Sequence, residues 1–222
     1  MANSVDIPQD IIDSVIAAVG DDTHLLKQCS LVSSSFLLPS RKHLFSRITI
    51  KSDETCERIH QLLVQNPVFQ TFVKTITLLN TDTFIFPKWM NGTSLLAILR
   101  LPFCCLESII LHHYTWQNGS SMSENLDWNC FGSEMKDALS NIILSSTLKT
   151  ISLNGMTNLP ITLFRHIAHL TTLELHCLTP NDFCDENSSS LTRATSKGVA
   201  PMASDTMIDR CVWHYGIAKV SL

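Results

Sequence analysis

The segments Leu148-Lys-Thr-Ile-Ser-Leu153 and Leu170-Thr-Thr-Leu-Glu-Leu175 follow one pattern, apolar-x-x-apolar-x-apolar, and this pattern decides the fold. Its alternation is typical of a short strand with one buried face. The same pattern occurs three times upstream, and successive blocks begin 28, 33, 42 and 22 residues apart. The upstream blocks are Phe45/Ile48/Ile50, Val73/Ile76/Leu78 and Leu106/Ile109/Leu111.

Helix-like stretches separate the blocks, at residues 56–64, 94–101, 135–144 and 161–168. A chain that alternates strand and helix, of the α+β or α/β class, can stack such units because none buries its apolar face alone. Residues 48–180 are therefore expected to form an irregular solenoid that resembles leucine-rich repeats, with an unrelated α/β domain as the alternative. The polar residue expected three positions after each strand is replaced by Met156 and Leu178, so the repeat is degenerate.

Helix signals are dense in the first 45 residues. Pro8 suits the start of a helix, Gly20 its end, and Asp22 the N-cap of a second helix. Three short helices cannot bury all their aliphatic side chains among themselves, so we expect them to contact either a partner protein or the rest of this chain. The apolar positions are Ile11, Ile12, Val15, Ile16 and Val19, then Leu25, Leu26, Cys29, Val32 and Phe36, then Leu37, Leu38, Leu44 and Phe45.

Three separated blocks in this region carry a resemblance to a known family. They are Ile7-Pro8-Gln9-Asp10-Ile11-Ile12, then Cys29-Ser30-Leu31-Val32-Ser33-x-x-Phe36, then Ser40-Arg41-x-x-Leu44-Phe45. In order and spacing they resemble the F-box, in the form common in basidiomycete fungi. Ile7, Asp10 and Ser34 depart from the usual Leu, Glu and Arg of that form.

The resemblance implies that residues 1–47 are an F-box that docks on the S-phase-kinase-associated adaptor subunit of an SCF ubiquitin ligase. F-box proteins commonly carry repeats that hold a target protein, and residues 48–180 would then be the substrate-binding region. Phe36 is assigned either to the interface or to the core of the helical module. Carried over by position, the interface residues are Ile7, Pro8, Ile11, Ile12, Val15, Leu31, Val32 and Phe36.

Two long loops, residues 81–91 and 114–131, are rich in aromatic side chains, which dominate the energetics of many protein interfaces. The alternative, which we favour for at least half of them, is that the loops fold back and bury their aromatic rings. The side chains concerned are Phe84, Phe86, Trp89, Tyr114, Trp116 and Trp128.

Composition argues against several other classes of function. The formal net charge is −4 and the 16 Lys and Arg form no basic run, so nucleic acid is not an expected partner. No window holds about 18 consecutive apolar residues and no secretory signal begins the chain, so we expect a cytoplasmic or nuclear protein without a membrane segment. No phosphate-binding, nucleotide-binding or hydrolase motif occurs, and we expect neither a cofactor nor catalysis.

Two pairs of adjacent residues, Cys104-Cys105 and His112-His113, raise the question of a metal site. If each pair lies on a strand, its two side chains point to opposite faces of the sheet. On that assumption neither pair chelates a metal as a unit, and none of the eight cysteines has C-x-x-C spacing.

Residues 181–222 lack the repeat pattern and are expected to be disordered or poorly ordered. A solenoid that ends near residue 175 would leave its last strand without a capping neighbour. The chain is thus interpreted as a ligase adaptor, with a repeat-based interaction module that has no ligase link as the main alternative. A hydrolase site invisible to motifs and a non-functional remnant are further alternatives.

Overall fold

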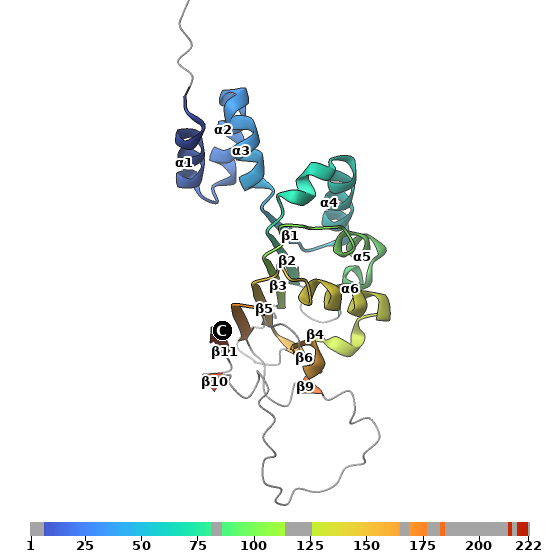
Figure 1. Ribbon diagram of the computed structural model, residues 1–222. Helices are drawn as coiled ribbons and strands as arrows, with labels where there is room; N and C mark the ends of the chain where they lie inside the picture. The colour runs from blue at the N-terminus through green and yellow to red at the C-terminus, as the bar shows by residue number, and fades with distance from the viewer. Residues whose placement is uncertain are drawn as a thin grey trace, which may run out of the picture.

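The computed structural model describes residues 7–80, 86–113, 126–164 and 169–176, and the backbone of 183–184, 213–214 and 217–221. Three helices come first, followed by alternating strands and helices (Figure 1). The first three helices are α1 (Gln9–Val19), α2 (Thr23–Val32) and α3 (Ser34–Leu44). The alternating elements are β1 (Arg47–Ile50), α4 (Asp53–Gln65), β2 (Thr75–Asn80), α5 (Thr93–Leu99), β3 (Ser108–His113), α6 (Ser133–Ile143), β5 (Thr150–Asn154) and β8 (Thr172–His176).

Short elements complete the described chain. Four 3₁₀ helices are η1 (Pro67–Thr71), η2 (Lys88–Asn91), η3 (Trp128–Cys130) and η4 (Ile161–Phe164). The two-residue strands β4 (Leu126–Asp127) and β6 (Met156–Thr157) pair with each other, as do β7 (Leu159–Pro160) and β9 (Phe183–Cys184). None of the described helices is both long enough and apolar enough to cross a lipid bilayer.

The five predicted apolar blocks form one parallel sheet, in the order β1-β2-β3-β5-β8. The strands align so that equivalent residues of the pattern are neighbours, which confirms the predicted strands and their spacing. Helices α4, α5 and α6 lie on one side of this sheet (Figure 1), and they confirm three of the predicted helical stretches. Of the fourth stretch, η4 covers residues 161–164, and 165–168 lie outside the described residues. The aligned rows are Ile48-Ile76-Ile109-Ile151-Leu173 and Ile50-Leu78-Leu111-Leu153-Leu175.

Both rows face the helices and are buried. They pack against the apolar faces of α4, α5 and α6, so one continuous core runs the length of the sheet. Every unit thus contributes to a core that it could not enclose alone, as expected of stacked strand–helix units. The buried helix residues include Cys56 and Leu63 of α4, Leu95 and Ile98 of α5, and Leu139 and Ile142 of α6.

A ladder of backbone carbonyls joins successive units just before their strands begin. Each of four carbonyl oxygens accepts two consecutive N–H groups from the next unit, at 2.8–3.0 Å. The N–H donors are Lys74 and Thr75, then Glu107 and Ser108, then Lys149 and Thr150, then Thr171 and Thr172. The acceptors are Ser46, Lys74, Glu107 and Lys149. This carbonyl ladder aligns the start of every strand by backbone groups alone.

Two polar residues lie at the C-terminal ends of β2 and β3, each two positions after the last residue of the apolar block. Asn80 is buried and its side-chain nitrogen contacts His113 Nδ1 at 2.7 Å. At Gly155 a Cβ atom would lie 3.0 Å from the His113 carbonyl oxygen, and φ is +66°. Glycine fits that close approach and that left-handed conformation without strain. Met156, at the expected polar position, is instead fully buried and forms part of β6; Leu178 lies outside the described residues.

The aromatic residues of the two long loops are largely buried where the structure describes them. Trp89 and Trp128 belong to the main core, and Phe86 packs edge-to-face on Phe131 with ring centroids 4.9 Å apart. The interpretation that these loops bury their rings is confirmed for Trp89 and Trp128, and Phe86 is half-buried against the same core. Phe84, Tyr114 and Trp116 lie outside the described residues.

The last strand of the parallel sheet has a further neighbour. Strand β11 (Ile217–Ser221) pairs antiparallel with β8, aligning Ala218 with Leu175, and β10 (Trp213–His214) pairs with β11. The expectation that β8 lacks a capping neighbour is therefore wrong, because the backbone groups of β11 pair with its edge. Of residues 181–222, the segment expected to be disordered or poorly ordered, the structure describes only the backbone of 183–184, 213–214 and 217–221, in short strands.

The three N-terminal helices, residues 9–44 and hereafter the helical module, have a core of their own. Ile12, Ile16 and Leu26 are its buried residues, and none of them belongs to the cluster beneath the sheet. An exposed ion pair between Asp21 and Arg47 links the α1–α2 turn to the start of β1. Such exposed pairs contribute about 0–1 kcal/mol, so this one adds little to the attachment of the module.

Candidate protein-interaction surface

The helical module exposes aliphatic side chains that its small core does not bury. Ile7, just before α1, and Ile11 and Val15 on α1 follow at intervals of four and are each 43–50% exposed. The next stripe round the helix carries Ile12 and Ile16, which are buried. The apolar residues of α1 are thus divided between the core of the helical module and the surface.

The end of α2 is the most exposed apolar part of the module. Leu31 and Val32 are 85% and 69% exposed, the highest values among the large hydrophobic side chains that the structure describes. Ser33 adopts an extended conformation, with φ −161° and ψ 167°, and so ends α2 before α3 begins. The two side chains therefore lie at a helix end, next to a turn, where no described core residue covers them.

Local sequence explains these helix boundaries. Pro8 precedes α1 and its carbonyl accepts hydrogen bonds from the N–H groups of Ile11 and Ile12. The carboxylate of Asp22 accepts from His24 N at 2.9 Å and from Leu25 N at 3.0 Å, which caps α2. The predicted N-cap is therefore confirmed.

Two of the predicted interface residues belong to the module's interior. Ile12 is 1% exposed and packs in the core with Ile16 and Leu26, so its side chain has no surface to offer a partner. We correct its assignment from interface to core. Phe36 is half-buried and packs against the same core.

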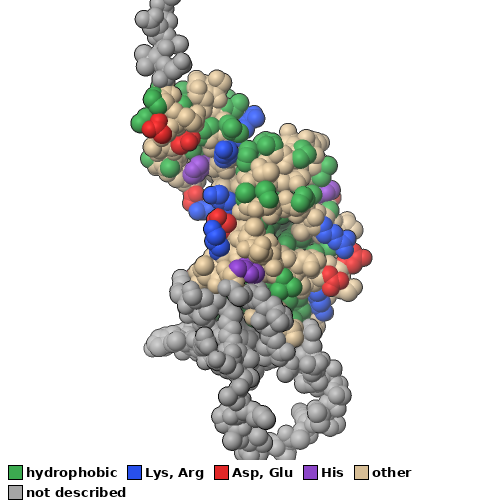
Figure 2. Space-filling view, viewed as in Figure 1, with side chains coloured by type: hydrophobic (Ala, Val, Ile, Leu, Met, Phe, Trp, Pro, Cys, Tyr) green, Lys and Arg blue, Asp and Glu red, His purple; other side chains and the backbone are tan. Residues whose placement is uncertain are grey.

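The surface also includes residues that sequence reasoning did not assign to it. Leu25 and Leu38, which the sequence identified only as apolar positions of the helices, are 43% and 51% exposed. Figure 2 shows hydrophobic side chains at the surface of the module, near the top of the view. Exposed aliphatic residues on all three helices of so small a module are typical of a protein-binding surface.

A second surface is the face of the parallel sheet opposite to helices α4–α6. This face carries mostly hydroxyl, amide and imidazole groups. Along each strand its residues alternate with those of the buried rows, as expected of a strand with one buried face. His112 Nε2 lies 3.3 Å from Ser152 Oγ, and His176 lies 3.8 Å from the Glu174 carboxylate. His112 and His113 point to opposite faces, as predicted for adjacent residues on a strand.

The contact between His112 and Ser152 does not have the accessibility that a catalytic serine needs. Ser152 is 4% exposed, so a substrate would not reach its Oγ atom without displacement of its neighbours. We interpret the pair as a structural contact between β3 and β5.

The pKa of His112 is lowered, first because burial disfavours the charged imidazolium and second because His176 lies nearby; Glu174 opposes the shift. A histidine of the unfolded chain binds its proton near pH 6.5, above the folded pKa of His112. Below that pH the unfolded state therefore binds more protons than the folded state. The free energy of unfolding keeps its full value with respect to His112 above about pH 6.5, and it falls as the pH decreases towards the folded pKa.

We predict that His112→Gln makes the free energy of unfolding less sensitive to acid. Urea denaturation at about pH 7.5 and about pH 5.5 measures this sensitivity. His43→Gln, at an exposed site of α3, is the control and is expected to keep the acid sensitivity of the native chain. An unchanged pH dependence in His112→Gln would contradict the assignment.

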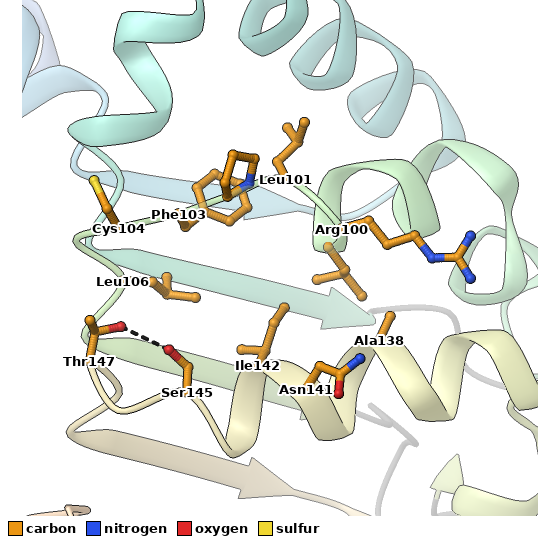
Figure 3. Close-up of a pocket in the computed structure, with 12 residues that line it drawn as sticks. Arg100, Leu101, Phe103, Cys104, Leu106, Ala138, Asn141, Ile142, Ser145 and Thr147 are labelled. Atoms are coloured by element: carbon orange, nitrogen blue, oxygen red, sulfur yellow. Dashed lines mark hydrogen bonds between the residues drawn. The ribbon is translucent and has the colours of Figure 1, made fainter.

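An open hollow of about 510 Å³ lies between the ends of α5 and α6 (Figure 3). Its wall is mainly apolar, with Leu101, Phe103 and Ile142, and it includes the Ser145–Thr147 hydroxyl pair at 3.0 Å. The residues that line it include no histidine and no carboxylate, so it lacks the base that a serine or cysteine nucleophile needs.

No side-chain cluster among the described residues brings together three or more metal-binding groups. Comparisons of the chain with models of known protein families, with curated proteins and with solved structures find no match.

Proposed function

We propose that this protein is the substrate-recognition adaptor of an SCF-type (cullin-RING) ubiquitin ligase. In this proposal residues 1–47, which include the helical module, are an F-box that binds the S-phase-kinase-associated adaptor subunit. Residues 48–180 are a degenerate leucine-rich-repeat-like region that holds a target protein. Catalysis belongs to other subunits, and the adaptor raises the rate by holding the target close to them.

The observation that carries the proposal is the exposure of Leu31 and Val32 at the end of α2. Both lie within the block of sequence that resembles the F-box, and the resemblance assigns them to the contact with the adaptor subunit. Ile7, Ile11 and Val15, which the resemblance assigns to the same contact, are also exposed.

The separate cores of the module and the sheet distinguish this proposal from its main alternative. If the helices only capped the repeats, their apolar residues would be expected to pack on the first strand–helix unit. Instead the described module residues form their own cluster, and several aliphatic side chains remain exposed. That arrangement favours a partner for the module over a capping role.

We expect the purified chain to bind the purified adaptor subunit, and we expect Val32→Asp to weaken that binding by about 30- to 1,000-fold. This corresponds to about 2–4 kcal/mol for placing an unpaired carboxylate in an apolar contact. Isothermal titration calorimetry measures both affinities. Because Val32 is 69% exposed, the variant is expected to fold.

Val64→Asp is the matched control, since Val64 is an exposed valine in the last turn of α4. It is expected to bind the adaptor subunit with native affinity. The proposal fails if the folded native chain does not bind, or if Val32→Asp binds as tightly as Val64→Asp.

A further inference from the structure

Cys104 and Cys105 lie in a turn between α5 and β3, and Cys105 is three residues before β3 begins at Ser108. Both thiols are exposed, and their sulfur atoms are 3.7 Å apart. The expectation that these side chains point to opposite faces of a strand is therefore wrong. The turn brings the two sulfur atoms to the same side of the chain.

The turn is fixed on both sides. Before it, Phe103 donates its N–H to the Leu101 carbonyl at 2.9 Å and packs against the main core. After it, Leu106 is buried, and the N–H groups of Glu107 and Ser108 both bond to the Lys74 carbonyl. The two thiols are thus held close together in advance of binding, which lowers the entropy lost when both bind one ligand.

A direct disulfide does not suit this pair. The Cα atoms of adjacent residues are about 3.8 Å apart across a trans peptide, below the roughly 4.4–6.8 Å that disulfides span. The observed sulfur separation of 3.7 Å also exceeds the disulfide bond length of about 2.05 Å. A third atom placed between the sulfurs avoids both constraints, because each sulfur then bonds to the bridging atom and not to the other sulfur.

The number of available ligands selects the kind of bridging atom. Zinc in protein sites takes about four ligands, whereas the described residues place no third metal-binding group beside these two thiols. A trivalent arsenical with one organic substituent needs only two sulfurs. We propose that Cys104 and Cys105 form a vicinal dithiol site for trivalent arsenicals of this type.

The reaction balances without an oxidant. An arsenical R–As=O condenses with the two thiols, two S–H bonds break, two As–S bonds form and one molecule of water leaves. Arsenic stays trivalent and neither sulfur is oxidised. The hydrogen bond with Cys104 is the main cause that raises the pKa of the Cys105 thiol. Fewer thiolates at neutral pH disfavour one-thiol reactions such as alkylation.

The surroundings of the site suit an aromatic substituent on the arsenic. Cys104 lines the open hollow together with Leu101, Pro102 and Phe103, whose side chains are apolar. Figure 3 shows Cys104 at one end of this hollow, with Phe103 beside it. Phenylarsine oxide is therefore the probe of choice.

The test uses the full chain, reduced with a phosphine and desalted, and then mixed with one equivalent of phenylarsine oxide. Intact-mass spectrometry counts the adduct after a wash with excess 2-mercaptoethanol, which competes well against one-thiol but poorly against two-thiol binding. We expect the native chain to keep one arsenical through this wash and to lose it to 2,3-dimercaptopropanol. We expect Cys104→Ser and Cys105→Ser each to retain it about 100-fold less well, since each loses the second bond to arsenic.

Cys130→Ser is the matched control, because Cys130 is an exposed cysteine without a neighbouring thiol in the sequence. It is expected to retain the arsenical as the native chain does. Thermal unfolding of all variants checks that the exposed substitutions leave the fold intact. The proposal is overturned if the native chain releases the arsenical to 2-mercaptoethanol, or if Cys104→Ser and Cys105→Ser retain it like Cys130→Ser.

Discussion

Replacing Ile16 with aspartate is expected to unfold the helical module while the parallel sheet stays folded. Ile16 is 1% exposed and is one of the three buried hydrophobic residues in the module's core. A carboxylate there loses its water without gaining a partner, a penalty of about 3–5 kcal/mol. A module of this size has only about 3–5 kcal/mol of stability, so the substitution removes nearly all of it.

Hydrogen exchange read by mass spectrometry distinguishes the two regions. Amides of α1, α2 and α3 are expected to lose their protection in Ile16→Asp, whereas those of β2, β3 and β5 keep theirs. Val15→Asp is the control for folding, since Val15 is the adjacent residue on the same helix and is exposed. Loss of protection in both regions of Ile16→Asp would show that the two cores unfold together.

The second large effect is expected in the sheet. Ile109 is fully buried in the central strand β3, aligned with Ile76 and Ile151 on either side. Ile109→Ala removes apolar contacts and leaves a cavity, which lowers the free energy of unfolding by about 2–5 kcal/mol. The midpoint of urea denaturation is expected to fall accordingly, with little change in its slope.

Ile110 provides a matched comparison within the same strand. It is the same residue type, one position further along, but it lies half-buried on the open face of the sheet. Ile110→Ala is expected to destabilise the protein by about 1 kcal/mol, less than Ile109→Ala, because less buried surface is lost. Equal effects of the two substitutions would contradict the assigned faces of β3.

The strands could be predicted because their signal is local. Each block needs only the alternation of a few apolar residues, and the blocks around Ile76, Ile109 and Ile151 carry it clearly. The same argument separates His112 from His113. It fails for Cys104 and Cys105, because the strand begins only at Ser108, and a strand rule does not apply to a turn.

The candidate interface was harder to predict at the level of single residues. Ile11 and Ile12 are adjacent in the apolar stripe of α1, yet one is exposed and the other buried. Helical spacing identifies the stripe but does not say where α2 and α3 cover it, since that depends on packing between helices. For the same reason the spacing identified Leu38 as an apolar position but did not show whether it is exposed or buried, and the structure leaves it exposed.

The pairing of strand β11 could not be predicted from the repeat pattern. Ile217-x-x-Val220-x-Leu222 is an apolar-x-x-apolar-x-apolar block, which the interpretation of residues 181–222 as lacking the repeat missed, but β11 pairs antiparallel with β8 and not as a further parallel unit. Antiparallel pairing is set by backbone hydrogen bonds along an available edge, and a pattern search for the next parallel unit does not detect it.

The carbonyl ladder has a consequence for how such a chain changes in length. Its acceptors at Ser46, Lys74, Glu107 and Lys149 are main-chain oxygens, so nearly any side chain is compatible with those positions. The intervals between them are as irregular as those of the apolar blocks, yet the strands stay aligned. Residues can therefore be gained or lost between strands without a register slip. An epitope grafted into such an interval would change the surface of the molecule and leave the register of the parallel sheet unchanged.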